Sequence, residues 1–374
     1  MSDVVLALNA GSSSLKLAVY RREGEREVQL LAESVKAGDG QDAARLDEAL
    51  LRVRDALGAA PDIVGHRLVH GGDDLTEPTL VDDAVMKQLE GLAALAPLHL
   101  PPALGLLRLA RERLPRSRHV AVFDTTFHRH LPDVSRRLPL PKKLRERGLR
   151  RYGFHGLSCE YALTQLGQTP PARVIVAHLG SGASLTAVRD GRSFDTTMGL
   201  TPTGGIPMSS RAGDLDPGVI VHLLRHACLS VDEVERLLNH ESGLKGLSGS
   251  ADMAELLRRS DEEAILAVDL FCYAVKKQIG AYAAALGGVD CLVFTGGIGE
   301  HSPEVRARAL SGLATFGLEL DTARNAEHGP IISSAQSRCT ARVIRSNEAL
   351  MIARHCWRAT ESAHGRRAGG GRTE

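Results

Sequence analysis

Apolar residues recur along the chain at two kinds of spacing, which predict helices alternating with strands. Leu46, Leu50, Val53 and Leu57 repeat at helical spacing, and residues 262–286 form the longest predicted helix, with one apolar side. The other predicted elements are apolar strands within residues 62–70, 119–123 and 289–294 and a helix at residues 104–114. This order is typical of α/β proteins, in which helices cover the sheets.

Residues 4–19 read VVLALNAGSSSLKLAV, which predicts two strands joined by a small, hydroxyl-rich turn. A glycine lets the backbone approach an anion closely, serine hydroxyls and an asparagine amide can donate hydrogen bonds, and a lysine adds positive charge. The residues that offer these groups are Asn9, Gly11, Ser12, Ser13, Ser14 and Lys16. The hairpin therefore predicts a cradle for phosphate groups.

Related segments occur twice more along the chain. Residues 173–188, RVIVAHLGSGASLTAV, repeat the order of strand, glycine and serine turn, and strand, and residues 291–302, CLVFTGGIGEHS, run from a strand into a glycine-rich turn. A tight hairpin explains any one of these loops, whereas three loops at strand ends favour nucleotide binding. The strand-to-strand turns at Gly11 and Gly180 argue against a Rossmann unit, and the absence of GxxxxGK[ST] argues against a P-loop kinase.

Composition and charge narrow the possible classes. With 374 residues the chain is long for one hydrophobic core, so we expect two domains. Its 46 basic and 45 acidic residues leave a formal charge of +1, which argues against nucleic-acid and membrane partners. We expect a cytoplasmic protein, because there is no leader pattern and no apolar run of the roughly 20 residues that a membrane span needs. The six scattered cysteines form no CxxC pair and are expected to be buried free thiols.

One stretch, residues 198–218, breaks the alternation of helices and strands. Its sequence, MGLTPTGGIPMSSRAGDLDPG, holds three prolines and five glycines and has no sustained periodicity. Loops of this length inside a compact domain are usually functional or disordered. Arg211, Asp214 and Asp216 within it favour a loop that belongs to a functional site over a plain connector.

Four polar residues in these segments could carry chemistry: Arg67, Asp124, His155 and Arg211. Taken singly, each has a structural explanation, as an ion-pair partner, a helix N-cap, a core histidine or a solvated side chain. Together with the three loops, they supply what phosphoryl transfer needs. These needs are cations for the phosphoryl oxygens, a carboxylate that holds magnesium and a positioned acceptor.

The chain resembles the acetate and propionate kinase family of the sugar kinase, Hsp70 and actin superfamily. The resemblance extends from about Val4 to Arg354 and rests on ten ordered motifs: NAGSSSLK, GHRLVHGG, LAPLH, VAVFDTTFH, RYGFHG, AHLGSGAS, DTTMGLTP, SRAGDLDP, TGGIGEHS and SNEALMIAR. It implies an α/β protein with two domains of related actin-like, ribonuclease H-like fold and an active site in the cleft between them. The implied parts are an actin-like domain of residues 1–148 with a C-terminal helix at about 349–362, a nucleotide-binding domain of residues 149–348, and a disordered tail at 363–374.

The resemblance also implies a reaction, a cofactor and partners. The reaction is reversible in-line transfer of the γ-phosphoryl group of ATP to acetate, which gives acetyl phosphate and ADP. The cofactor is Mg²⁺ or Mn²⁺. The implied partners are a small carboxylate, ATP and a second copy of the chain, because the family suggests a homodimer formed through the second domain.

Matching motif positions imply the site residues. Arg67 and Arg211 would bind the carboxylate and the transferring phosphoryl group, for which the planar fork of arginine is suited, and His155 would stabilise the transition state. The other implied groups are Asn9, Asp124 and Glu348 around the metal; Asn9, Ser12, Ser14 and Lys16 at the phosphates; and His178, Gly180, Ser181, Gly182, Gly297, Ile298 and Gly299 along the nucleotide. His99 and His128 also lie in matching motifs.

Family comparison further points to an acyl pocket. Its wall would be Val69, Leu98, Phe154 and Pro202, the acetate-preferring pattern; one extra methylene changes specificity by only about 1 to 3 kcal/mol, so propionate should react more slowly than acetate. The chain departs from the usual family pattern at Cys159, Ser181, Gly204 and Ala349. Two alternatives remain open, a kinase for propionate, butyrate or another short acid, and a nucleotide-gated ATPase without an acyl acceptor.

Overall fold

The computed structural model describes residues 3–10, 14–36 and 42–369. Its contacts divide the chain into two compact units, the first comprising Met1–Thr126 and Asn347–Glu374 and the second Phe127–Ser346. The sequence-based division placed the change after residue 148. Both divisions return the end of the chain to the first part.

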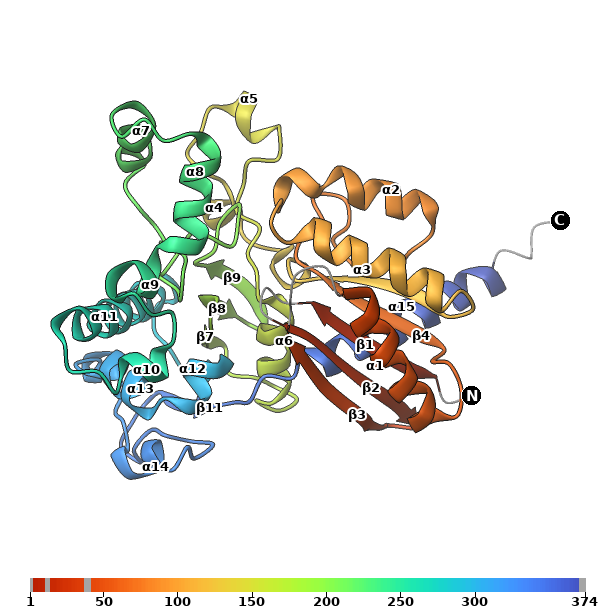
Figure 1. Ribbon diagram of the computed structural model, residues 1–374. Coiled ribbons are helices and arrows are strands. Elements are labelled where there is room, and N and C mark those ends of the chain that lie inside the picture. Colours follow the sequence, from red (N-terminus) through yellow and green to blue (C-terminus); the bar gives the residue numbers. More distant parts are fainter. Residues whose placement is uncertain (1–2, 11–13, 37–41, 370–374) are drawn as a thin grey trace. The chain divides into compact units, whose positions relative to one another are not determined.

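The first unit is built on a six-stranded sheet (Figure 1). Its strands, in the order β3-β2-β1-β4-β6-β5, are β1 (Val4–Ala10), β2 (Ser14–Glu23), β3 (Arg26–Lys36), β4 (Ile63–Leu68), β5 (Thr79–Leu80) and β6 (Arg118–Phe123). β2 pairs antiparallel with β1 and β3, whereas β1, β4 and β6 run parallel. The chain therefore runs in opposite directions in β1 and β2, as the hairpin pattern predicts.

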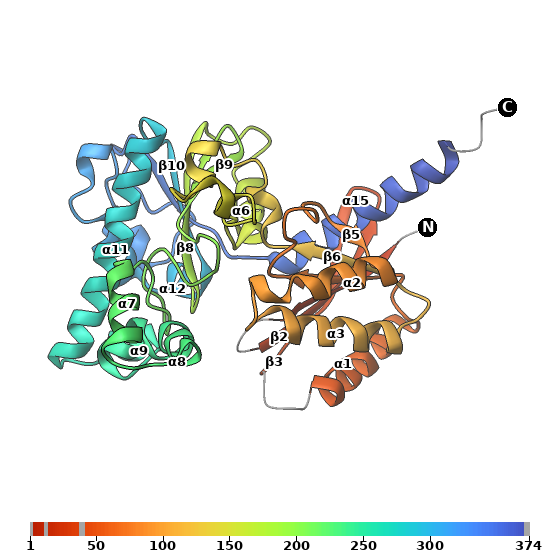
Figure 2. The same cartoon turned by 90° about the horizontal axis from the view of Figure 1, so that it is seen from above.

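Helices cover both faces of this sheet. Leu6 and Leu8 pack with residues of α1 (Asp42–Leu57) and α3 (Leu100–Arg113) on one face. α15 (Glu348–Gly369) packs on the opposite face, where a Cβ on Gly65 would lie 2.5 Å from the Cys356 side chain (Figure 2). Only glycine fits that approach of helix to strand.

The five-stranded sheet of the second unit repeats the strand order of the first. Its strands, in the order β11-β10-β7-β8-β9, are β7 (Arg173–Leu179), β8 (Ala183–Arg189), β9 (Arg192–Thr196), β10 (Cys291–Thr295) and β11 (Thr340–Val343). β7, β8 and β9 form an antiparallel meander and β7, β10 and β11 run parallel, as do β1, β4 and β6 in the first unit. α6 (Gly156–Thr164) and α11 (Glu262–Leu286) pack on this sheet. The expected α/β fold with two related domains is therefore confirmed.

Shorter elements complete the two units. They are α2 (Asp83–Gly91), η1 (Ala93–Leu95), η2 (Thr126–His128), α4 (Asp133–Arg136), α5 (Lys142–Arg145), α7 (Pro217–Arg225), α8 (Val231–Arg236), η3 (Leu237–Glu241), α9 (Gly243–Ser248), α10 (Met253–Leu256), α12 (Gly296–His301), α13 (Pro303–Leu310), η4 (Ala314–Phe316) and α14 (Thr322–Ala326). No helix in residues 3–10, 14–36 and 42–369 is long and apolar enough to cross a membrane.

Four local expectations differ from the structure. The sequence predicts a turn after β10, and this prediction is wrong, because Gly296–His301 form the short helix α12. α3 begins at Leu100, four residues before the predicted start, since two prolines are accommodated in its first turn. Five cysteines are buried free thiols, but Cys228 is exposed. α15 reaches Gly369, within the stretch from residue 363 for which the sequence predicts disorder.

Candidate active site

Arg67 and Asp124 form an ion pair at one edge of the first sheet. Because β1, β4 and β6 run parallel, the ends of these strands lie at the same edge, where ligands of open α/β sheets bind. Arg67 Nε donates to Asp124 Oδ2 at 3.1 Å and Arg67 Nη2 donates to the same oxygen, while Arg67 Nη1 donates to the carbonyl of Ala10 at 3.2 Å. The Asp124 side chain is 1% exposed. The pair therefore connects three strand ends.

Asn9 and Glu348 meet in the same unit. Asn9 Nδ2 donates to Glu348 Oε2 at 2.7 Å, and Glu348 is the first residue of α15. Burial alone would lower the pKa of Arg67, but the charges of Asp124 and Glu348 outweigh burial and raise this pKa above its ordinary value. Asn9, Arg67, Asp124 and Glu348 thus form one group, the first-unit cluster.

The other predicted phosphate ligands lie on the β1–β2 hairpin. Lys16 pairs with Asn9 across the two antiparallel strands, so both residues belong to the same face of the sheet, and its side chain is exposed. Ser14 begins β2, and its side chain is outside the described part of the chain, as are Ser12 and the rest of the turn. The phosphate cradle stays a prediction.

In the second unit, His155 lies in a left-handed turn that precedes α6. Its φ of 56° is unusual for a residue with a side chain and costs about 1 kcal/mol or more. His155 Nδ1 is 2.9 Å from Oγ of Ser184, a buried residue of β8, and the His155 ring lies 4.3 Å from the ring of His178 between centroids. Sequence reasoning missed Ser184, because the contact spans 29 residues.

Arg211 and His155 both approach the turn between β7 and β8. A Cβ placed on Gly182, in the turn between β7 and β8, would lie 3.4 Å from both Arg211 Nη1 and His155 Nε2. Arg211 Nη1 also donates to the Pro202 carbonyl at 3.2 Å. His155, His178, Gly182 and Arg211 are called the second-unit cluster below.

The predicted nucleotide turns also meet. β7 and β10 run parallel with His178 opposite Thr295, so the chain after each strand emerges at one edge. A Cβ on Gly180 would lie 3.8 Å from His178 Nε2 and 3.9 Å from the Gly297 nitrogen. Ile298 and Gly299 continue α12 from Gly297.

The loop that carries Arg211 is irregular but held by backbone hydrogen bonds. Residues 198–216 form neither helix nor strand, and α7 begins at Pro217. The Met208 nitrogen donates to the Arg211 carbonyl at 3.0 Å, and the Ser209 nitrogen donates to the Ser181 carbonyl at 3.1 Å. The second of these bonds attaches the loop to the β7–β8 turn.

Two charged residues that the sequence did not single out hold α12. Glu300 Oε1 accepts hydrogen bonds at 2.9 Å from the nitrogens of Gly296 and Ser346. Arg306 is fully buried and donates to the Gly299 carbonyl and to Asn325 Oδ1, both at 2.8 Å. Burial lowers the pKa of Arg306 to about 10. These contacts fix both ends of the segment that includes Gly297 and Gly299.

The predicted acyl wall divides between the units. Val69 and Leu98 belong to the first unit, where Val69 is buried and Leu98 is 40% exposed. Phe154 and Pro202 are buried residues of the second unit. The wall as a whole therefore stays a prediction.

The first-unit cluster offers oxygen donors of the kind that magnesium prefers. Two carboxylates and one amide lie close to Arg67, and Mg²⁺ usually takes one or two carboxylates together with waters and substrate phosphates. Across the described ranges, no group of three or more His, Cys, Asp and Glu side chains is arranged as a metal cage. The residues present fit a cation that completes its shell with phosphate and water.

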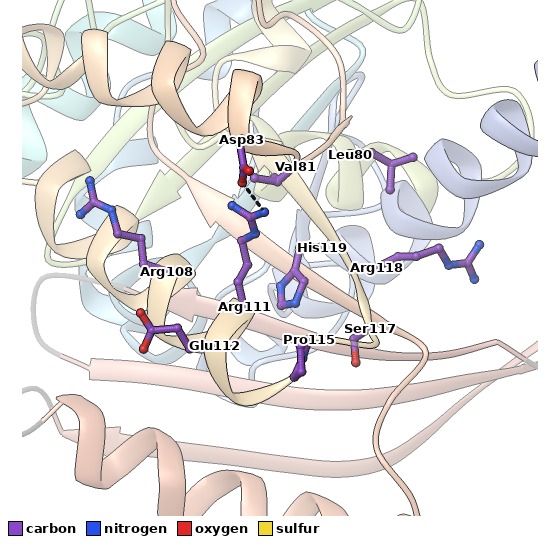
Figure 3. Close-up of a pocket in the computed structure, with 10 residues that line it drawn as sticks. All are labelled: Leu80, Val81, Asp83, Arg108, Arg111, Glu112, Pro115, Ser117, Arg118 and His119. Atoms are coloured by element: carbon purple, nitrogen blue, oxygen red, sulfur yellow. Dashed lines mark hydrogen bonds and ion pairs between the residues drawn. The ribbon is translucent and has the colours of Figure 1, made fainter.

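A separate cavity of about 540 Å³ lies at the other end of β6 (Figure 3). Its lining residues are Leu80, Val81, Asp83, Arg108, Arg111, Glu112, Pro115, Ser117, Arg118 and His119. Each arginine is held by a carboxylate: Arg111 by Asp83 at 2.9 Å, Arg108 by Glu90 at 2.7 Å and Arg118 by Asp3 at 3.3 Å. None of the predicted site residues that the structure describes lines this cavity.

Cys159, which departs from the family pattern, is a core residue. It is fully buried on α6 and packs with Val174, Val176 and Val293 of the sheet. This environment suits an inert thiol rather than a reactive one.

The chain is similar along nearly its whole length to curated proteins. A family model with the description "Acetokinase family" matches residues 46–354. An acetate kinase from Methylocella silvestris is 42% identical, with 95% of this chain and 97% of that protein covered. An acetate kinase from Streptomyces coelicolor is 43% identical, with 94% of this chain and 96% of that protein covered.

Solved structures show the same similarity. The acetate kinase of Porphyromonas gingivalis has a TM-score of 0.84 and 32% sequence identity, covering 96% of this chain and 100% of that one. A propionate kinase from Francisella tularensis has a TM-score of 0.84 and 33% identity, covering 95% of this chain and 99% of that one.

Proposed function

Because the chain belongs to the acetokinase family of carboxyl-group phosphotransferases, we propose that it transfers the γ-phosphoryl group of ATP to acetate, reversibly giving acetyl phosphate and ADP. The observation that carries this proposal is the approach of Arg211 Nη1 and His155 Nε2 to one point at Gly182. Donors held ready at one place are what stabilises the charge that develops on a transferring phosphoryl group. In this proposal, Arg211 and His155 bind the phosphoryl oxygens in the transition state.

The first-unit cluster is proposed to bind the acceptor. Among the described contacts, three of the five N–H groups of Arg67 donate to Asp124 and Ala10. The other two N–H groups can donate to the oxygens of a substrate carboxylate. Arginine matches the paired oxygens of a carboxylate in geometry. Acetate is ionised at neutral pH, so its attack needs no strong base, and Asp124 serves to orient Arg67 and to hold metal.

Mg²⁺ is the proposed cofactor, held with Asp124 and Glu348 directly or through water and with Asn9 beside them. When bound, it would neutralise charge on the phosphate oxygens. The chain's own part is to keep these oxygen donors oriented, which the Asn9 to Glu348 bond and the Arg67 to Asp124 pair support.

The nucleotide is proposed to lie along the glycine turns. Asn9, Ser12, Ser14 and Lys16 would contact phosphate, and the second-unit contacts would come from His178, Gly180, Ser181, Gly182, Gly297, Ile298 and Gly299. The close approach of Gly180 to Gly297 supports a shared role for these two turns.

The purified chain is expected to form acetyl phosphate from ATP and acetate, trapped with hydroxylamine as the hydroxamate. Comparison of acids with two to four carbons should give the highest kcat/KM for acetate and a roughly 10-fold or larger decrease for propionate, because one methylene is worth about 1 to 3 kcal/mol. Absence of acyl phosphate with every acid would contradict the proposed function. A higher kcat/KM for propionate would instead favour the activity named for the Francisella tularensis relative.

A homodimer through the second unit is also proposed. α7 has no buried residue although most of its side chains are apolar, and α11 exposes Leu266 and Tyr273. Val221 on α7 is 45% exposed and Leu266 is 56% exposed. α7 alone exposes Val219, Val221 and Leu224, and exposed apolar side chains grouped on one helix commonly mark interfaces.

Light scattering at micromolar protein concentration is expected to give twice the mass of the 40.0 kDa chain. Val221→Lys with Leu266→Lys should produce monomers, because a buried charge in the interface is costly to desolvate. Val134→Lys, at an exposed position in α4, is the matched control. A monomeric wild-type protein would contradict this proposal.

The cytoplasm is the proposed compartment. Free thiols are typical of a reducing environment, and Cys159, Cys272, Cys291, Cys339 and Cys356 are buried and free.

A further inference from the structure

His128 is a buried histidine outside the two clusters. It ends η2 and is 2% exposed. Its Nδ1 lies 2.8 Å from Oγ of Ser193 on β9, and its Nε2 lies 2.9 Å from the carbonyl oxygen of Phe154. Both ring nitrogens are therefore engaged, across 65 and 26 residues of sequence.

The protonation state of His128 follows from its surroundings. Burial lowers its pKa to about 4, so the ring is neutral near pH 7 and carries one N–H. A carbonyl oxygen can only accept, so Nε2 must hold the proton and donate to Phe154. Nδ1 then accepts from the Ser193 hydroxyl, and this pair of bonds fixes the tautomer and the ring orientation.

Two of the residues that His128 contacts, Gly153 and Phe154, immediately precede His155 in the sequence. A Cβ on Gly153 would lie 2.6 Å from His128 Cγ, so the ring packs closely against this glycine, whose φ is +78°. The next carbonyl, that of Phe154, receives the Nε2 hydrogen bond. His155 follows with φ of 56°, a left-handed conformation that persists only where the surrounding structure enforces it.

We propose that His128 is a positioning residue of the phosphoryl-transfer site, which holds the Phe154 carbonyl and thereby sets the left-handed turn that presents His155 beside Gly182 and Arg211. The inference rests on the proposed function. Such supporting hydrogen bonds keep a reacting side chain within the narrow geometry that catalysis requires.

Two amide substitutions separate this role from simple core packing. Glutamine places an amide N–H near the position of Nε2, so His128→Gln should keep the bond to Phe154. Asparagine reaches only to the position of Nδ1, so His128→Asn should lose it. We expect kcat for acetyl phosphate formation to fall roughly 10- to 100-fold in His128→Asn, with KM for ATP little changed, and to recover to within a few-fold of wild type in His128→Gln.

The imidazole resonances of His155, assigned with His155→Gln, provide a readout that does not depend on activity. They should shift in His128→Asn and return toward the wild-type positions in His128→Gln. Unchanged kcat in folded His128→Asn would overturn the proposal, and so would equal losses in both variants with unmoved His155 resonances.

If His128→Asn does not fold, the variant Ser193→Ala tests the proposal instead, because it removes only the hydroxyl that donates to His128 Nδ1. Lower kcat with unchanged KM for ATP is expected there, and unchanged kcat would overturn the proposal. A wild-type protein that makes no acyl phosphate would instead refute the proposed function, while the resonance comparison would still test the support of His155 by His128.

Discussion

Replacement of Arg211 with alanine is expected to lower kcat for acetyl phosphate formation by roughly 10³-fold or more. An arginine that binds a phosphoryl group in the transition state contributes on this scale. Nη1 of Arg211 and Nε2 of His155 both approach Gly182 in the β7–β8 turn. The loop that carries Arg211 is attached to the same turn by the hydrogen bond from Ser209 to Ser181. The measurement is steady-state turnover at saturating ATP and acetate.

Two further variants show whether the loss is specific. Arg211→Lys keeps the charge but not the planar fork, and it should remain strongly impaired. Arg308→Ala removes an arginine from surface ion pairs with Glu304 and Asp269, and it should turn over like the wild type. Wild-type kcat in Arg211→Ala would remove Arg211 from the chemistry.

Replacement of Asp124 with alanine should abolish magnesium-dependent activity. The substitution removes a proposed metal ligand and also leaves the guanidinium of Arg67 without its carboxylate partner. Loss of one member of a buried ion pair lowers the free energy of unfolding by about 3 kcal/mol. Activity titrated with Mg²⁺ and unfolding in denaturant measure the two effects separately.

Asp124→Asn is the matched control, because its side-chain oxygen can still accept from Arg67 while the negative charge is lost. We expect this variant to recover much of the stability but little of the activity, and to bind Mn²⁺ weakly by electron paramagnetic resonance. Normal turnover of Asp124→Ala at wild-type Mg²⁺ concentrations would refute the metal role.

The fold was largely predictable because its elements have strong local patterns. α11 has the predicted bounds, 262–286, since its apolar side repeats over seven turns. The two hairpins were recognisable from strands that flank small polar turns. α12 was not predictable, because glycine has a low helix propensity and the helix is held by Glu300 and by Arg306, which is distant in sequence from the Asn325 that it also binds.

The candidate site was predictable only in its parts. Arg67 and Asp124 stood out as polar residues at the ends of apolar strands, and parallel pairing of β4 with β6 brings them together. The supporting contacts of His128 and Ser184 depend on pairs far apart in sequence, for which one chain gives no signal. In our proposal, the left-handed turn at His155 likewise depends on His128, which packs against Gly153, rather than on a local preference.

Because α15 packs on the first sheet, it determines which of the two units can finish folding first on the ribosome. α15 covers the Gly65 face of that sheet, Trp357 Nε1 donates to the carbonyl of Asp3 at 3.1 Å, and Arg354 binds Glu27. These residues are synthesised after the rest of both units, so the earliest part of the polypeptide waits with one apolar face uncovered until α15 has left the ribosome. All residues of the second unit, 127–346, are synthesised before α15, so this unit can finish folding before the first one does. This order is the reverse of the usual progression of nascent domains from the N-terminus onward.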